Sequence, residues 1–134
     1  MRFTVKEKAS GCSFHTPEEV AQSFGQLKEA DQESFWVLGF NSKNKEILRE
    51  CLFKGGINSC SVDPKLIFKR VLKSGCAAFI TVHNHPSGDP TPSVEDFQIS
   101  RRIKEIAQVL DLQFLDDIVI GEEGFTSLVQ SKGG

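Results

Sequence analysis

The sequence lacks several features that mark other classes of protein. No two of its four cysteines form a C-x-x-C pair, so a zinc ribbon or a thioredoxin-type redox site is not expected. No apolar run approaches the ~18 residues that cross a membrane, and the first ten residues are too polar for a signal peptide. We therefore expect a cytoplasmic protein with reduced, mostly buried thiols and no disulfide framework.

A strong charge of one sign is also missing. The formal net charge is −2, which gives no overall attraction to nucleic acid or to an anionic membrane. Two groups of basic residues are typical of solvated helix faces: Lys65, Lys69, Arg70 and Lys73, and Arg101, Arg102 and Lys104. The chain is otherwise ordinary for a globular protein, with 39% apolar and 25% charged residues, and its 134 residues suffice for one hydrophobic core.

Hydrophobic periodicity predicts helices that alternate with strands. Helices are expected over residues 15–31, 64–75 and 93–111, and strands over 34–41, 46–54, 76–84, 112–121 and 125–130. Thr16, Asp63 and Ser93 are the predicted helix caps, and Gly75 is the predicted end of the second helix. This order predicts a single α/β domain over residues 1–134, with a core from about 14 to 130 and a mixed sheet flanked by helices.

The stretch TVHNHPSGDPTPSVED, residues 81–96, contains the candidate metal ligands. His83 and His85 are two residues apart at the end of a predicted strand, so both side chains should point to one face. Asp96 lies in the first turn of the next helix, after a proline-rich loop, and offers an oxygen ligand. Two nitrogens, one oxygen and a water form the open tetrahedral arrangement of a hydrolytic zinc site. The spacing therefore predicts one Zn²⁺ ion.

A purely structural role for the same residues stays open at this point. Ser93 and Asp96 form an S-x-x-D capping box, in which Asp96 only bonds the backbone and favours the helix dipole, an effect of ~0.5–2 kcal/mol. The two roles are compatible, because the start of a helix can also orient a ligand carboxylate. Asn84, between the two histidines, should face away from the metal.

The longer string HNHPSGDPTPSVEDFQISRRIKE resembles the JAMM (JAB/MPN) metalloprotease domain, and in particular its RadC-like bacterial branch. The pattern H-x-H-P, six residues, S-x-x-D carries the resemblance, which covers roughly residues 33–128. The resemblance implies a fold of the cytidine-deaminase-like, JAB/MPN type. It also implies that His83, His85 and Asp96 bind zinc and that Ser93 is the motif serine.

The same resemblance implies zinc-dependent hydrolysis of peptide or isopeptide bonds, with a protein or peptide as substrate. The ion would activate a water and polarise a carbonyl. The family has a glutamate ahead of an apolar strand, and Glu33 fits that place better than Glu29 or Glu46. Glu33 would then be the general base, and Ser93 would donate a hydrogen bond to the oxyanion. From its own context, Glu33 is a solvated residue after the first helix.

The chain departs from the RadC-like pattern at one position, and two other functions are alternatives to hydrolysis. RadC-like proteins commonly carry LDH where this chain has Leu115-Asp116-Asp117, so the surroundings of the site differ at Asp117. The link between the RadC name and DNA repair makes a nucleic-acid-binding protein or metal nuclease the second hypothesis, which the acidic total charge disfavours. A non-catalytic interaction module is the third, and the presence of all three ligands disfavours it.

Overall fold

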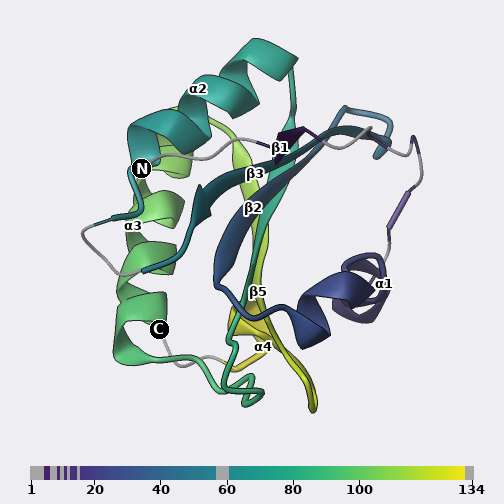
Figure 1. Ribbon diagram of the computed structural model, residues 1–134. Helices are drawn as coiled ribbons and strands as arrows, with labels where there is room; N and C mark the ends of the chain where they lie inside the picture. The colour runs from purple at the N-terminus through teal and green to yellow at the C-terminus, as the bar shows by residue number, and fades with distance from the viewer. Residues whose placement is uncertain are drawn as a thin grey trace.

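The computed structural model describes residues 5–6, 9, 11, 13–14, 16–56 and 61–131. Strands and helices alternate along most of this length, as Figure 1 shows. In chain order the elements are β1 (Val5–Lys6), α1 (Pro17–Gln22), the 3₁₀ helix η1 (Gly25–Glu29), β2 (Ser34–Phe40), β3 (Glu46–Lys54), α2 (Pro64–Ser74), β4 (Ala78–Asn84), α3 (Val94–Val109), β5 (Gln113–Gly121), β6 (Gly124–Ser127) and α4 (Leu128–Ser131).

A six-stranded mixed sheet, in the order β1-β3-β2-β4-β5-β6, forms the centre of the protein. All neighbouring strands are antiparallel except β4 and β5, which are parallel and are joined through α3. Parallel neighbours need such a crossover, because the chain must return to the edge of the sheet where the first strand began. The predicted α/β domain with a mixed sheet is confirmed, and β4, like its neighbour β2, is a fully buried inner strand.

Helices cover both faces of this sheet. In Figure 1, α2 and α3 lie on one side of the strands and α1 lies on the other. Phe79 belongs to the core on one face, with residues of α2 and α3, whereas Ile80 and Val82 belong to the core on the other, with residues of α1. Alternate side chains of a strand point to opposite faces. His83 therefore lies on the same face as Phe79, toward α3.

The predicted helix caps are confirmed. The Thr16 hydroxyl accepts a hydrogen bond from the Glu19 N–H at 3.1 Å, and the Asp63 carboxylate accepts one from the Lys65 N–H at 2.9 Å. Gly75 ends α2 with a φ of 78°, a left-handed conformation that glycine adopts without the penalty of a Cβ. Local sequence therefore sets where these helices begin and end.

The prediction of one continuous helix over residues 15–31 is wrong, because the segment forms two shorter helices. α1 ends before Ser23, and η1 begins at Gly25. Arg49 on β3 donates to the backbone and hydroxyl oxygens of Ser23, at 3.3 and 3.1 Å, and its guanidinium lies 4.3 Å from the centre of the Phe24 ring. These contacts from another element hold the backbone between the two helices, and Gly25 is a weak helix former.

The C-terminal segment 125–130, expected as one strand, is a strand end followed by a helical turn. Asp116 on β5 accounts for the difference. Its carboxylate accepts hydrogen bonds from the Ser127 hydroxyl at 2.6 Å and from the Val129 N–H at 3.3 Å. An acceptor from a neighbouring strand thus satisfies a backbone donor in the first turn of α4. The short strand β1, paired with β3, was also not predicted.

Two of the four cysteines lie in the described part of the chain. Cys51 and Cys76 are buried and free, and burial raises the pKa of both thiols. Cys12 and Cys60 fall outside the described residues. Over the described ranges, no helix combines the length and the apolar character that a membrane crossing requires.

Candidate metal centre

Two histidines project from the end of β4 toward α3. His83 is 2% exposed, and His85, just after the strand, is half-buried. Asn84 points the other way: its side-chain oxygen accepts from the N–H and hydroxyl of Ser34, at 2.8 and 3.1 Å, and its side-chain nitrogen donates to the carbonyl of Gln32 at 3.1 Å. The expectation that Asn84 faces away from the histidines is therefore confirmed, and its bonds hold the start of β2 against the end of β4.

The first turn of α3 holds Asp96 in a fixed orientation. The Ser93 hydroxyl accepts from the Asp96 N–H at 3.1 Å, and the Ser93 N–H donates to Asp96 Oδ2 at 2.8 Å. These two bonds form the predicted capping box. The Asp96 side chain is buried against the sheet. The capping box is therefore the local structure that positions this carboxylate.

The three candidate ligands converge on one point. His83 Nε2 lies 3.0 Å from Asp96 Oδ1, and His85 Nε2 lies 3.0 Å from Asp96 Oδ2. One ligating atom from each residue lies within 4.8 Å of the other two. Ligands ~2.0–2.2 Å from a tetrahedral zinc ion stand a little more than ~3 Å apart, so small movements suffice to surround one ion. Two imidazoles and one carboxylate suit Zn²⁺ and leave a fourth position open.

The loop between β4 and α3 sets the orientation of the His85 ring. His85 Nδ1 lies 3.0 Å from the backbone carbonyl oxygen of Asp89. A carbonyl oxygen only accepts, so Nδ1 carries the proton, and the neutral ring then presents a lone pair at Nε2. The Asp89 carboxylate in turn accepts from the N–H and hydroxyl of Thr91, at 3.0 and 2.7 Å. The loop thus holds His85 in the form that binds a metal through Nε2.

The carboxylates of Asp96 and Asp117 favour a positive charge at the candidate ligands. Burial lowers the pKa of His83, but the nearby carboxylates of Asp117 and Asp96 outweigh burial and raise it to about 10. The hydrogen bond to Asp96 raises the pKa of His85. Burial raises the pKa of Asp96, yet the two histidines outweigh it and hold that pKa well below its usual range. Protons on the histidines or a bound dication can supply the positive charge that the two carboxylates attract.

Asp117 lies behind His83, on the side of the ring away from Asp96. Its Oδ1 is 3.6 Å from His83 Nδ1, and the residue is 1% exposed. From the sequence, Asp117 was only a departure from the RadC-like pattern. Its place beside His83 depends on the pairing of β4 with β5, and no local pattern reveals that pairing.

Glu33 and Ser93 are the two predicted catalytic residues. Phe35↔His83 is the last pair between β2 and β4, and Glu33 lies two residues before Phe35, just ahead of β2. Glu33 is half-buried, and its backbone carbonyl accepts from Gly55 at 2.8 Å. Ser93 is exposed at the start of α3. Ser93 therefore contacts one candidate ligand, Asp96, and the role of Glu33 stays a prediction; neither residue belongs to the cluster of candidate ligands.

The other glutamates and the basic groups have different surroundings. Glu46 is buried and pairs with Arg49 at 2.8 Å, which disfavours it as the base. The Glu29 side chain is outside the described part of the chain. Arg70 of the α2 basic group pairs with the buried Glu50 at 2.9 Å, whereas the remaining members of both basic groups are exposed.

Comparison with known proteins assigns the family. The model of the RadC-like JAB domain matches residues 14–133. The chain belongs to the RadC-like JAB domain family. The resemblance stated from the motif is thereby confirmed, and the match extends well beyond the motif on both sides.

Relatives of this RadC-like JAB domain occur in several bacteria. A UPF0758 protein of Bacillus licheniformis is 43% identical over 118 residues, which are 87% of this chain and 52% of the relative. One from Staphylococcus aureus is 47% identical over 105 residues, 78% of this chain and 48% of the relative. One from Clostridium perfringens is 40% identical over 128 residues, 95% of this chain and 56% of the relative. The chain thus spans about half the length of these relatives.

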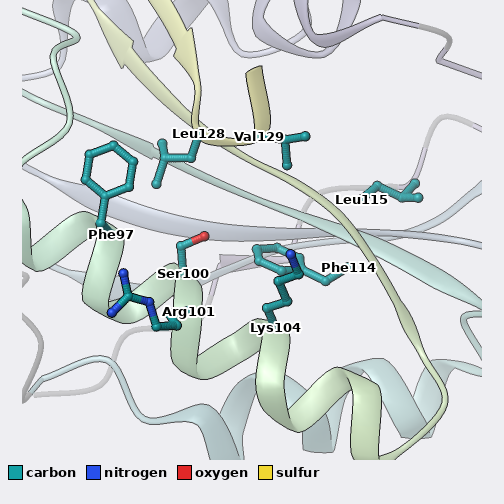
Figure 2. Close-up of a pocket in the computed structure, with 8 residues that line it drawn as sticks. All are labelled: Phe97, Ser100, Arg101, Lys104, Phe114, Leu115, Leu128 and Val129. Atoms are coloured by element: carbon teal, nitrogen blue, oxygen red, sulfur yellow. The ribbon is translucent and has the colours of Figure 1, made fainter. Parts of the chain in front are cut away.

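A groove of about 480 Å³ runs along α3 in this RadC-like JAB domain. Figure 2 shows Phe97, Arg101 and Lys104 projecting from α3, with Leu128 of α4 across from them and further lining from β5. Phe97 directly follows Asp96 in the sequence, but none of His83, His85 and Asp96 lines the groove. Its lining combines apolar side chains with two cations.

Proposed function

We propose that this chain is a zinc-dependent hydrolase that cleaves peptide or isopeptide bonds. The observation that carries the proposal is the convergence of two Nε2 atoms on the two oxygens of Asp96, each at 3.0 Å, with the His85 ring held by the Asp89 carbonyl. This arrangement suits one metal ion and leaves a fourth ligand position open. Membership of a JAB family supports the same reaction class.

In the proposed reaction, His83, His85 and Asp96 hold the ion. A bound zinc ion supplies Lewis acidity and lowers the pKa of a water ligand toward ~7. The Glu33 carboxylate takes a proton from the attacking water and delivers it to the leaving nitrogen. The Ser93 hydroxyl already accepts a bond from the Asp96 N–H, so its own O–H is the donor for the developing oxyanion.

The substrate we propose is a protein or peptide chain. The groove along α3 supports this proposal, because its apolar lining and the cations Arg101 and Lys104 suit an extended chain with apolar and acidic side chains. Phe97 lines the groove and follows Asp96 in the sequence, so α3 carries both part of the groove and one proposed metal ligand.

Zinc content and hydrolysis of a peptide and isopeptide library test the proposal. Wild-type protein should contain about one zinc per chain, and Asp96→Asn should lose both zinc and activity. Glu95→Gln removes a charge from the same helical turn at an exposed position and should keep both. Glu33→Gln should keep zinc and lose hydrolysis, with the exposed Asp31→Asn as its control. Wild-type zinc content in Asp96→Asn would refute the metal site, and full activity in Glu33→Gln would refute the base.

A further inference from the structure

Buried polar atoms without a hydrogen-bond partner cluster behind the candidate metal centre. In the described part of the chain there are four such side-chain atoms: Thr81 Oγ1, His83 Nδ1 and both carboxylate oxygens of Asp117. Buried polar groups almost always have partners, because an unpaired one costs about 1–3 kcal/mol. All four atoms belong to three residues, so one part of the sheet holds polar groups whose partners need an explanation.

Strand pairing brings these three residues together. β4 and β5 are parallel, with Thr81 paired to Asp117, and His83 is two residues farther along β4 on the same face. His83 Nδ1 and Asp117 Oδ1 are 3.6 Å apart, a little longer than a hydrogen bond. A movement of about half an ångström closes this gap. Both side chains are nearly inaccessible to solvent, so water does not compete from the bulk.

Of the two ring nitrogens of His83, Nδ1 is the one without a hydrogen-bond partner. Its Nε2 faces Asp96, and its plane is stacked on the Phe35 ring at 5.8 Å between centroids. If Nε2 is to bind a metal, Nδ1 must carry the proton and donate it. For His85 the acceptor at Nδ1 is the Asp89 carbonyl. For His83 the group in that place is the Asp117 carboxylate.

We propose that Asp117 is the positioning residue of the metal centre: its carboxylate accepts the Nδ1–H of His83 and so fixes the ring with Nε2 toward the metal. Thr81 offers its hydroxyl proton to the other carboxylate oxygen, which keeps the carboxylate in place. Carboxylates behind ligating histidines orient the ring and strengthen its basicity in this way. The proposal rests on the metal binding proposed above.

Zinc affinity, measured by competition with a chelator on the 134-residue chain, tests the proposal. Asp117→Asn should bind zinc roughly 10–100-fold more weakly than wild type. Asp116→Asn is the matched control. Asp116 is buried on the same strand, but its side chain points to the opposite face and accepts a hydrogen bond from Val129 of α4. The zinc affinity of this variant should equal that of wild type. Thermal unfolding in EDTA, recorded for each protein, separates a loss of affinity from a loss of folding.

Two outcomes distinguish this proposal from the proposed function. If wild type binds zinc and folded Asp117→Asn binds it equally tightly, the positioning role is overturned and the hydrolase proposal stands. If wild type binds no zinc, both are overturned. Should Asp117→Asn not fold, nitrogen NMR of the zinc-loaded wild type decides: we expect His83 to carry a proton on Nδ1 and the metal on Nε2. Metal on Nδ1 would overturn the role of Asp117.

Discussion

The metal-free protein should lose stability as the pH rises from about 6.5 to about 8.5. His83 has a pKa of about 10 in the folded protein, against an ordinary value of 6.5 in the unfolded chain. Between these values the folded state keeps a proton that the unfolded state has released. The stabilisation is therefore complete below the unfolded pKa and is lost as the pH rises toward the folded pKa.

The size of this loss follows from the same two values. Over the two pH units above the unfolded pKa, the linkage integrates to about 2 kcal/mol of unfolding free energy. The raised pKa of His85 acts in the same direction. Above about pH 8.5 the thiols of Cys51 and Cys76 also ionise in the unfolded chain, while burial raises their pKa in the folded protein, so they reduce stability there too.

Urea unfolding in EDTA at several pH values measures this effect. His83→Gln removes the titrating ring and should flatten most of the slope. Added zinc should reverse the trend, because the metal binds neutral imidazoles, so the stabilisation by zinc should grow as the pH rises. An unfolding free energy that stays constant or increases with pH in EDTA would refute the charge pairing inferred for His83.

Two further substitutions test the frame around the metal. Ser93→Gly keeps the cap to within a few tenths of a kcal/mol, so hydrolysis should fall ~10²–10³-fold with little change in unfolding free energy; full activity would leave Ser93 with the cap alone. Gly121→Ala would place a Cβ against the Gly88 carbonyl and 2.8 Å from the Pro90 nitrogen, which should cost ~1–3 kcal/mol in urea unfolding and weaken zinc binding. The control is Gly25→Ala, whose Cβ meets nothing within 4 Å; equal losses in both variants would contradict the close packing of the loop.

Local sequence was enough to predict most elements and the place of the candidate ligands on them. The Asp63 and Ser93 caps join residues two or three apart, so these residues mark the starts of their helices wherever the helices pack. The spacing of His83 and His85 sets their common face through the two-residue period of a strand. The capping box likewise orients Asp96 through local bonds, because both of its hydrogen bonds lie within one turn.

Tertiary structure alone decided which groups from distant segments meet. The carboxylate of Asp116 turns the last strand into a helical turn, and Arg49 on β3 holds the break after α1. The register of β4 on β5 places Asp117 behind His83 and beside Thr81, although these strands are separated by the whole of α3. Register depends on how the complete core packs on both faces of the sheet, since a shift of one residue turns every side chain to the other face. The sequence by itself therefore determined the candidate ligands, and the packed sheet determined what stands behind them.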